Sequence, residues 1–391
     1  MNFEHFSVPR IVFGKGRFQE TGTVAATFGR KALIVTHDSA SALPLTDRLA
    51  ALLRSAGVTA EVHRVAGEPE VKDVDAGIAT AQASNAEVLI GLGGGSAIDA
   101  AKAMAGVLAN GGSALDYMEV IGQGKKITVP AVPWIAVPVT AGTGAEVTRN
   151  AVIGFREKHF KASLRSELLM ARVALIDPEL HIKVRPEVTA RCGMDALTQC
   201  LEAFVSQKAQ PLSDQAALDG LHRAARSLRR AYQKGDDVEA RGEMALAALC
   251  GGIALTNAGL GAVHGFAAPL GAQIPVPHGT VCAALLPHVM ETNVKALREA
   301  GTATAALDRY AEIGRVLSGQ PKLDRDEAME AGVAAAKALV RDLQIPALGS
   351  FGLKNEDVPA IVERARKASS MRYNPVDLDE ETLTYILRAA I

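Results

Sequence analysis

Charge is absent from one long internal stretch of the sequence. From Met244 to Met290 there is no Asp, Glu, Lys or Arg, although the 391 residues together contain 42 Lys and Arg against 43 Asp and Glu. A membrane-spanning helix needs about 20 strongly apolar residues in succession, whereas glycine and proline interrupt this stretch repeatedly. We therefore expect no membrane span and interpret the stretch as helix buried on all sides in a globular protein.

Aromatic residues are few, and there is no excess of basic residues. The chain has 10 Phe, 5 Tyr and 1 Trp and a formal net charge of −1. So few aromatic rings offer little stacking surface for bases, and a near-neutral chain has no general attraction to nucleic acid or anionic lipid. Neither nucleic acid nor a membrane is an expected partner.

Cysteine is scarce and shows no paired spacing. Cys192, Cys200, Cys250 and Cys282 form no C-x-x-C pair, and in a chain of this length they are expected to be buried small hydrophobic residues rather than two disulfides. The N-terminal segment has Glu and His where a signal peptide would begin its apolar core, so no secretory signal is expected. These features predict a reducing, cytoplasmic environment.

Strand-like and helix-like segments alternate through the first part of the chain. We expect buried strands at residues 31–36, 61–65, 87–91 and 132–137, with helices from near Pro44 to Gly57, over 71–84 and over 96–108. This alternation is typical of a parallel α/β sheet. Residues 1–177 are predicted to form an α/β dinucleotide-binding domain.

The strand signals stop at about residue 178. Long segments rich in Ala and Leu follow, and their spacing predicts helices over residues 186–206, 213–233 and 237–258. Residues 178–391 are therefore predicted to form a second, all-helical domain that holds the substrate and any metal.

Two loops after predicted strands suit phosphate and ribose. Gly93, Gly94, Gly95 and Ser96 end one strand and open a helix, where glycines admit a close backbone approach and the helix start attracts a pyrophosphate. A tight strand-to-helix turn is the structural alternative for so short a motif. The loop at residues 138–148 is rich in threonine and glycine, so the two loops together favour a dinucleotide.

Four residues of the second half have the chemistry of metal ligands. Asp195 and Gln199 are four apart and share a helix face, while His264 and His278 stand on either side of a proline-rich break. One carboxylate, two imidazoles and an amide oxygen match a divalent-metal shell. Singly, each residue also has a structural interpretation: Asp195 paired with an arginine, His264 as a hydrogen-bonded core histidine, and His278 as a helix cap.

Several separated motifs occur in a characteristic order along almost the whole chain. They are PRIVFG at 9–14, GGGS at 93–96, TAGTGAEVT at 140–148, GMDALT at 193–198, VHG at 263–265, PHG at 277–279, LLPHVMETN at 285–293 and Asn374-Pro375. In this order the sequence resembles the iron-containing (group III) alcohol dehydrogenases, a group related to glycerol dehydrogenase and dehydroquinate synthase. The resemblance implies a two-domain architecture of the dehydroquinate synthase type and a homodimer.

The resemblance also implies roles for particular residues. Residues 93–96 would bind the pyrophosphate, and other cofactor contacts would come from Thr140, Thr143, Thr148, Lys161 and Asp99, the last on the nicotinamide side. Asp195, Gln199, His264 and His278 occupy the metal-ligand positions, with His264, His278 and Asp99 the expected catalytic residues. His37 and Asp38 stand where many relatives have the aspartate that holds the ribose 2′-hydroxyl, so both NAD and NADP remain open.

Two departures from the family pattern concern the metal. Gln199 stands where the family usually has a histidine ligand, and Ala268 replaces another histidine near the substrate. Either Asp195, His264 and His278 keep a Zn²⁺ or Fe²⁺ ion, with water or Gln199 in the fourth place, or the metal is lost and the histidines act on substrate directly. We favour retention, because a carboxylate and two imidazoles suffice for a catalytic zinc.

The expected activity is reversible hydride transfer between a nicotinamide cofactor and a small alcohol, aldehyde or ketone in a cleft between the domains. A metal would polarise the carbonyl oxygen, and in the absence of a histidine at Ala268 the proton would pass through His278, a ribose hydroxyl or water. The alternatives are a metal-independent oxo-acid reductase of the maleylacetate type, a lyase of the dehydroquinate synthase type, and a non-catalytic nucleotide-binding relative.

Overall fold

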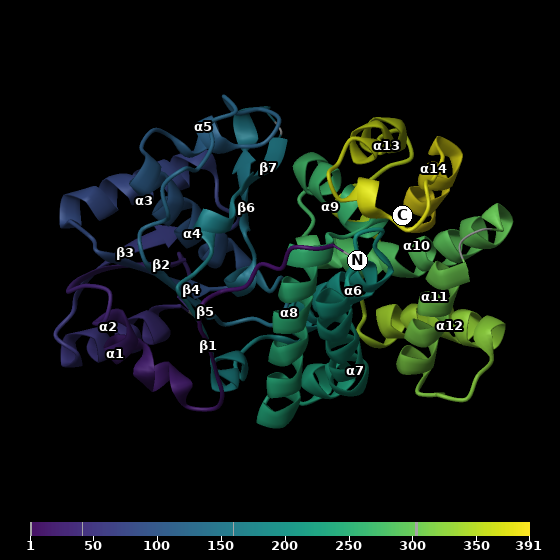
Figure 1. Cartoon of the computed structure of the whole chain (residues 1–391), viewed down its shortest axis with the longest axis horizontal. Helices are drawn as coiled ribbons and strands as arrows, with labels where there is room; N and C mark the ends of the chain where they lie inside the picture. The colour runs from purple at the N-terminus through teal and green to yellow at the C-terminus, as the bar shows by residue number, and fades with distance from the viewer. Residues whose placement is uncertain (1, 41, 159, 302–303) are drawn as a thin grey trace. The chain divides into compact units, whose positions relative to one another are not determined.

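The computed structural model describes residues 2–40, 42–158, 160–301 and 304–391, which fold into two compact units (Figure 1). Phe6–Thr140 and Gly144–Ile182 form what we call the α/β unit. Met1–His5, Ala141–Thr143 and Lys183–Ile391 form what we call the helical unit. The domain boundary expected between residues 177 and 178 stays a prediction.

The α/β unit is built on one parallel sheet. Its strands follow the order β1 (Ile11–Phe13), β8 (Val173–Ile176), β5 (Trp134–Pro138), β4 (Val88–Gly93), β2 (Lys31–His37) and β3 (Thr59–Val65). Every residue of β4 and β5 is buried, as expected for strands covered on both faces. The predicted parallel sheet is confirmed, and β8 adds a strand that the sequence did not reveal.

Helices cover both faces of this sheet. In Figure 1, α1 (Thr21–Ala25) and α2 (Leu43–Ser55) lie on one face, and α3 (Val71–Ser84) and α4 (Gly95–Asn110) on the other. The remaining elements are α5 (Ala114–Tyr117), an antiparallel hairpin of β6 (Asn150–Phe155) and β7 (Phe160–Arg165), and 3-10 turns η1 (Arg17–Glu20), η2 (Ala145–Val147), η3 (Arg156–Lys158), η4 (Glu167–Leu169) and η5 (Pro178–His181).

The strand order reverses direction between β2 and β4. The chain runs from β2 outward to β3 and then returns past β2 to β4. In parallel sheets, the carboxyl ends of the two strands at such a reversal form the usual ligand-binding crevice. His37 ends β2 and Gly93 ends β4, so this edge contains the loop predicted to bind a dinucleotide.

The helical unit confirms the predicted second class of structure. Its elements are α6 (Pro186–Val205), α7 (Pro211–Gln233), α8 (Val238–Ala258), α9 (Ala262–Gln273), α10 (His278–Ala300), α11 (Thr304–Ser318), α12 (Arg325–Asp342), η6 (Leu348–Phe351), α13 (Val358–Arg366), η7 (Met371–Tyr373) and α14 (Glu380–Ala389). Helix α6 contacts α7, α8 and α10, and most of its residues from Gly193 onward are buried. It is therefore a central helix of this unit.

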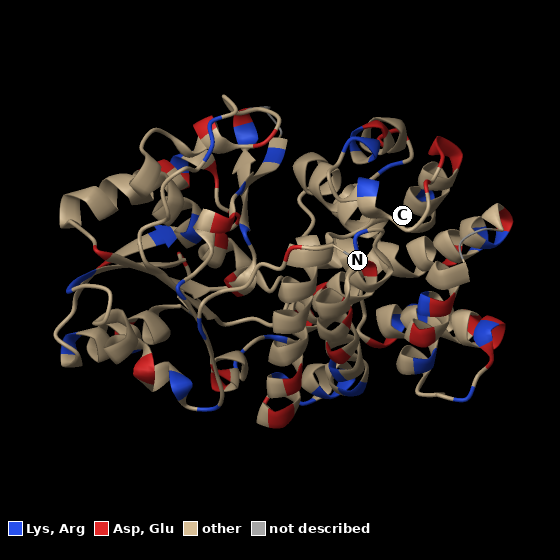
Figure 2. Ribbon diagram, in the orientation of Figure 1, with Lys and Arg blue, Asp and Glu red and all other residues tan. Residues whose placement is uncertain are grey.

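The uncharged stretch from Met244 to Met290 forms the latter part of α8, all of α9 and the first half of α10. Figure 2 shows α9 without acidic or basic residues, and much of the stretch belongs to the apolar core of the unit. Among the described helices, no single one is long and apolar enough to cross a membrane. Helices α8 and α9 satisfy that criterion only together, across a break bent by 99°.

Candidate metal centre and cofactor-binding loops

Four potential ligand atoms converge inside the helical unit. Asp195 comes from α6, His264 from α9, and His278 and Cys282 from α10. One carboxylate oxygen, two ring nitrogens and one sulfur all lie within 4.8 Å of one another. The structure thus brings together Asp195, His264 and His278, as their predicted role requires, and adds Cys282, which was expected only as a buried small residue.

The start of α9 is held in place by two side chains from other segments. Glu202 Oε1 accepts from the Val263 N–H at 2.7 Å, and Asn374 Oδ1 accepts from the Ala262 N–H at 3.1 Å. The first N–H groups of a helix have no partner within the helix, so these bonds stabilise the start of α9. A Cβ on Gly261 would lie 2.9 Å from both acceptor oxygens, which explains the glycine before this helix.

Glu202 also orients the His264 ring. His264 Nδ1 donates to Glu202 Oε2 at 2.6 Å, so Nε2 is left to face Asp195 Oδ1 at 3.3 Å. A carboxylate that fixes the tautomer of a ligating histidine is typical of metal sites. Sequence reasoning missed Glu202, although it follows Asp195 by seven residues and therefore lies on the same face of α6.

The pKa values of the side chains in this group depend on one another. Burial alone raises the pKa of Asp195, but His278 and His264 hold it well below its usual range. Burial lowers the pKa of His278, yet contacts with Cys282 and Asp195 raise it to about 10. Burial likewise lowers the pKa of His264, and Cys282 and Asp195 outweigh that effect. A divalent cation would compete with these ring protons, so its binding would release protons.

The donor set fits a divalent metal. Among the described residues, every ion-pair and hydrogen-bond partner of these four side chains is another member of the group or Glu202. Carboxylate, imidazole and thiolate are the ligands of zinc sites. Gln199, one turn beyond Asp195, is only 2% exposed, and its amide oxygen has no hydrogen-bond partner in the described part of the chain.

The structural interpretations given above for Asp195, His264 and His278 agree with the structure only in part. Asp195 pairs with His264 and His278 rather than with an arginine. His278 is the first residue of α10, but the helix cap is Pro277 and no side chain caps it. His264 does have the hydrogen bond expected of a core histidine, and this bond is compatible with a ligand role.

The predicted pyrophosphate loop lies at the strand-order reversal. Helix α4 begins at Gly95, and its cap, Gly94, makes no side-chain cap hydrogen bond. This leaves the helix start available to an anion. A Cβ on Gly93 would lie 2.6 Å from the Ala97 Cβ and 3.2 Å from the His37 ring. The turn therefore requires glycine for its own packing, and it also brings His37 beside the loop.

Other predicted cofactor residues are distributed around this edge. The Thr140 hydroxyl would lie 3.3 Å from a Cβ on Gly94, whereas Thr143 belongs to the helical unit. Asp38 is exposed, directly after β2. Lys161 on β7 forms an ion pair of 2.8 Å with Glu68. The roles of these residues in cofactor binding stay predictions.

Asp99 and Thr148 belong to a buried network around Lys102. Lys102 is 0% exposed, and its Nζ donates to Thr148 Oγ1 at 2.7 Å and to the Asn150 carbonyl oxygen at 2.6 Å. Asp99 Oδ1 lies 3.4 Å from the same Nζ, and Asp99 Oδ2 accepts from the Val152 N–H at 3.0 Å. Both predicted residues thus connect α4 to the segment around β6.

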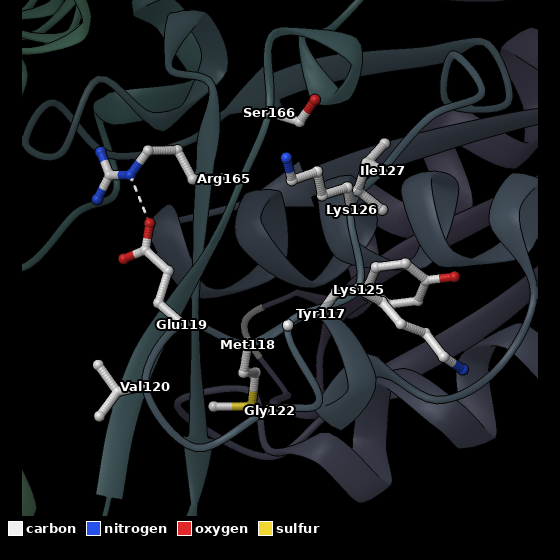
Figure 3. Close-up of a pocket in the computed structure, with 11 residues that line it drawn as sticks. Tyr117, Met118, Glu119, Val120, Gly122, Lys125, Lys126, Ile127, Arg165 and Ser166 are labelled. Carbon is white, nitrogen blue, oxygen red and sulfur yellow. Dashed lines mark hydrogen bonds and ion pairs between the residues drawn. The ribbon is translucent and has the colours of Figure 1, made fainter.

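A cavity of about 520 Å³ lies elsewhere in the α/β unit (Figure 3). Two of its cations are paired, Lys125 with Asp116 and Arg165 with Glu119. No residue predicted from the sequence as a site residue lines it; the lining is Tyr117, Met118, Glu119, Val120, Gly122, Gly124, Lys125, Lys126, Ile127, Arg165 and Ser166.

The α/β unit has an uncapped helix start at its strand reversal, and the helical unit has converging O, N and S donors. These are features of nucleotide-dependent enzymes with a metal centre. The family model described as iron-containing alcohol dehydrogenase matches residues 9–178, and the model described as the C-terminal part of the Fe-containing alcohol dehydrogenase family matches residues 189–391. The chain belongs to the iron-containing alcohol dehydrogenase family.

Individual relatives cover nearly the whole chain. It is 34% identical over 390 residues to a choline dehydrogenase of Bacillus subtilis (strain 168), covering 99% of this chain and 94% of the relative. It is 32% identical over 390 residues to an NAD-dependent methanol dehydrogenase of Bacillus methanolicus, covering 99% of each. The crystal structure of a 1,3-propanediol oxidoreductase matches with a TM-score of 0.92 at 32% identity and covers 100% of both chains.

These matches confirm the predicted family, fold class and enzyme class. The chain is an oxidoreductase that interconverts an alcohol and its carbonyl partner by hydride transfer, and its family uses a nicotinamide cofactor and a divalent metal.

Proposed function

We propose that the chain reversibly oxidises a small, uncharged alcohol with NAD⁺ and that Asp195, His264 and His278 hold a divalent metal at the reacting oxygen. The convergence of these three side chains from α6, α9 and α10 within 4.8 Å is the observation that supports the proposal. When bound, Zn²⁺ or Fe²⁺ supplies a Lewis acid that stabilises a developing alkoxide.

The chain's own residues orient this centre and leave one side of it accessible to solvent. Glu202 holds the His264 ring through Nδ1, and Asp195 is only 2% exposed, so water is excluded from its carboxylate. The side chain of His278 is 32% exposed, which makes it the member of the group most accessible to solvent. With Nε2 facing the metal position, His278 Nδ1 keeps its proton and donates toward solvent, and we assign uptake of the alcohol proton to a water or ribose hydroxyl on this exposed side of the group.

An uncharged substrate is favoured by the composition of α9. Ala268 follows His264 by four residues, so a methyl group lies on the helix face that presents the imidazole. The stretch from Met244 to Met290 contains no cation that would pair with a substrate carboxylate, which argues against the oxo-acid alternative.

NAD is the favoured cofactor because Asp38 places an exposed carboxylate directly after β2, where it would repel a 2′-phosphate. The pyrophosphate is assigned to Gly93, Gly94, Gly95 and Ser96 at the start of α4. Thr140, Thr143, Thr148, Lys161, His37 and Asp99 are assigned to the remainder of the cofactor. A homodimer and a cytoplasmic location complete the proposal and rest on the resemblance and on the cysteine pattern.

The test is an alcohol and aldehyde panel, run with NAD⁺ and with NADP⁺, on protein whose metal content has been measured. We expect alcohol-dependent NADH formation that disappears on chelation and returns with added Zn²⁺ or Fe²⁺. Unchanged turnover after exhaustive chelation would exclude the metal. Absence of any alcohol-dependent reduction of either cofactor would exclude the activity.

A further inference from the structure

The thiol of Cys282 is the one member of the donor group that the proposed function leaves without a role. Cys282 lies on α10, one turn beyond His278, and is 0% exposed. Its Sγ lies 3.6 Å from His264 Nε2 and 3.7 Å from His278 Nε2. The inference below rests on the proposed use of Asp195, His264 and His278 as ligands.

Four of the six distances between the donor atoms are close to the edges of a tetrahedral metal shell. Metal–nitrogen and metal–oxygen distances of about 2.0–2.1 Å and a zinc–sulfur distance of about 2.3 Å imply tetrahedron edges of about 3.3 Å between N and O and about 3.6 Å between S and N. Asp195 Oδ1 lies 3.3 Å and 3.6 Å from the His264 and His278 nitrogens. The Asp195–His278 distance is longer than the expected edge by about 0.3 Å, and both sulfur distances fall within about 0.1 Å of theirs.

The position of Cys282 suits a shared cation. Its Sγ is nearly equidistant from the His264 and His278 nitrogens, and the same two nitrogens face Asp195 Oδ1. His264 Nδ1 is engaged by Glu202 Oε2, so Nε2 is the ring nitrogen directed at Asp195 and Cys282. The thiol and the carboxylate therefore share both imidazoles as neighbours.

We propose that Cys282, as a thiolate, is the fourth protein ligand and that the centre is an Asp–His–His–Cys site selective for Zn²⁺. The thiol proton passes to solvent when the metal binds. A thiolate shifts the preference of an O and N donor set toward zinc, which accepts a fifth ligand in catalytic sites. Cys282 thereby takes the ligand place that the family pattern assigns to the position of Gln199.

The experiment examines the ligands directly, on the full chain loaded with one metal at a time. X-ray absorption of the Zn²⁺-loaded protein should show one sulfur at about 2.3 Å. The Co²⁺-loaded protein should show a near-ultraviolet thiolate-to-metal charge-transfer band. This band should be absent from Cys282→Ser and present in the control Cys250→Ser, whose thiol lies 3.7 Å from Asp219 Oδ2 in α7. Zn²⁺ affinity of Cys282→Ser should fall on the order of 100-fold.

The spectrum of the unmodified protein keeps the test decisive even if Cys282→Ser does not fold. A zinc shell of only oxygen and nitrogen in that protein overturns the proposal, as does a charge-transfer band that survives in folded Cys282→Ser. Either result leaves the proposed function intact if alcohol-dependent NADH formation persists. Conversely, a sulfur-containing shell in a protein that oxidises no alcohol supports Cys282 as a ligand and excludes the proposed activity.

Discussion

Each unit of the molecule contains a buried polar cluster, and the two clusters differ in where their positive charge comes from. In the α/β unit, Lys102 donates to Thr148 and Asn150 and faces Asp99. In the helical unit, Asp195 is surrounded by two histidines and a cysteine, and no described lysine or arginine pairs with any of them. Buried charge is costly unless it is paired. The first cluster is neutralised by a lysine of the chain, whereas the second holds its positive charge as ring protons of His264 and His278, which a cation from solution would displace.

The largest expected effect comes from removing the carboxylate of the helical unit. Asp195→Ala should lose the bound metal and about 1,000-fold in kcat, because several kcal/mol of Lewis-acid stabilisation disappear. Metal analysis and NADH formation measure the two losses. Asp219→Ala, a change at a half-exposed carboxylate of α7, is the matched control and should retain both. Full activity in Asp195→Ala would remove the distinction between the clusters.

The second effect comes from removing the internal cation of the α/β unit. Lys102→Met leaves Asp99 buried without its counter-charge, so the free energy of unfolding should fall by about 3–5 kcal/mol. Urea unfolding measures the change, and Lys126→Met, at an exposed lysine, is the control. Metal content should stay as in the parent protein. A loss of metal together with stability would show that the two clusters are not independent.

A smaller effect is expected at Glu202. Glu202→Gln keeps the shape of the side chain but places either an N–H group or a weaker acceptor against His264 Nδ1, so the ring loses its fixed tautomer. Metal affinity should fall about 10–100-fold, measured by competition with a chelator. Glu243→Gln on α8, at a partly exposed residue paired with Arg223, should show no change. An unaltered affinity in folded Glu202→Gln would contradict the orienting role.

The last effect concerns the pH dependence of stability in the α/β unit. Burial raises the pKa of Glu146 to about 7 from 4.5, so the folded state retains a proton that the unfolded state has released. Stability should therefore fall as pH rises from about 4.5 to about 7. Glu146→Gln should unfold like the parent at pH near 4 and be more stable by about 3 kcal/mol at pH near 8. Parallel pH profiles for the two proteins would contradict the retained proton.

Local patterns in the sequence predicted most elements within a few residues. The strand expected at 31–36 is β2 (Lys31–His37), and the helix expected at 237–258 is α8 (Val238–Ala258). Strand β8 was missed because it has only 4 residues and pairs with β1, far along the chain. The hairpin β6–β7 was missed because the alternating α/β pattern predicts parallel strands only.

The residues of the candidate site also divide into those that the sequence predicted and those that it did not. Asp195, His264 and His278 were identified because their residue types and motifs are distinctive. Cys282 was correctly predicted to be buried, but its spacing of four from His278 was overlooked as a sign of a shared helix face. Lys102 contacts Thr148, and Glu202 contacts His264. Both contacts join residues far apart in the sequence, so no local sequence pattern predicts them.

The sequence alone determined the family, the parallel sheet, the helical second half and the identity of three potential ligands, because these depend on periodicity and on motifs read along the chain. Only the tertiary structure decided which donors meet. It placed Cys282 beside both histidines and the Glu202 carboxylate against His264 Nδ1. It also placed hydrogen-bond acceptors around the Lys102 ammonium group. The physical reason is that pairing and coordination depend on distances between elements, and helix packing sets those distances.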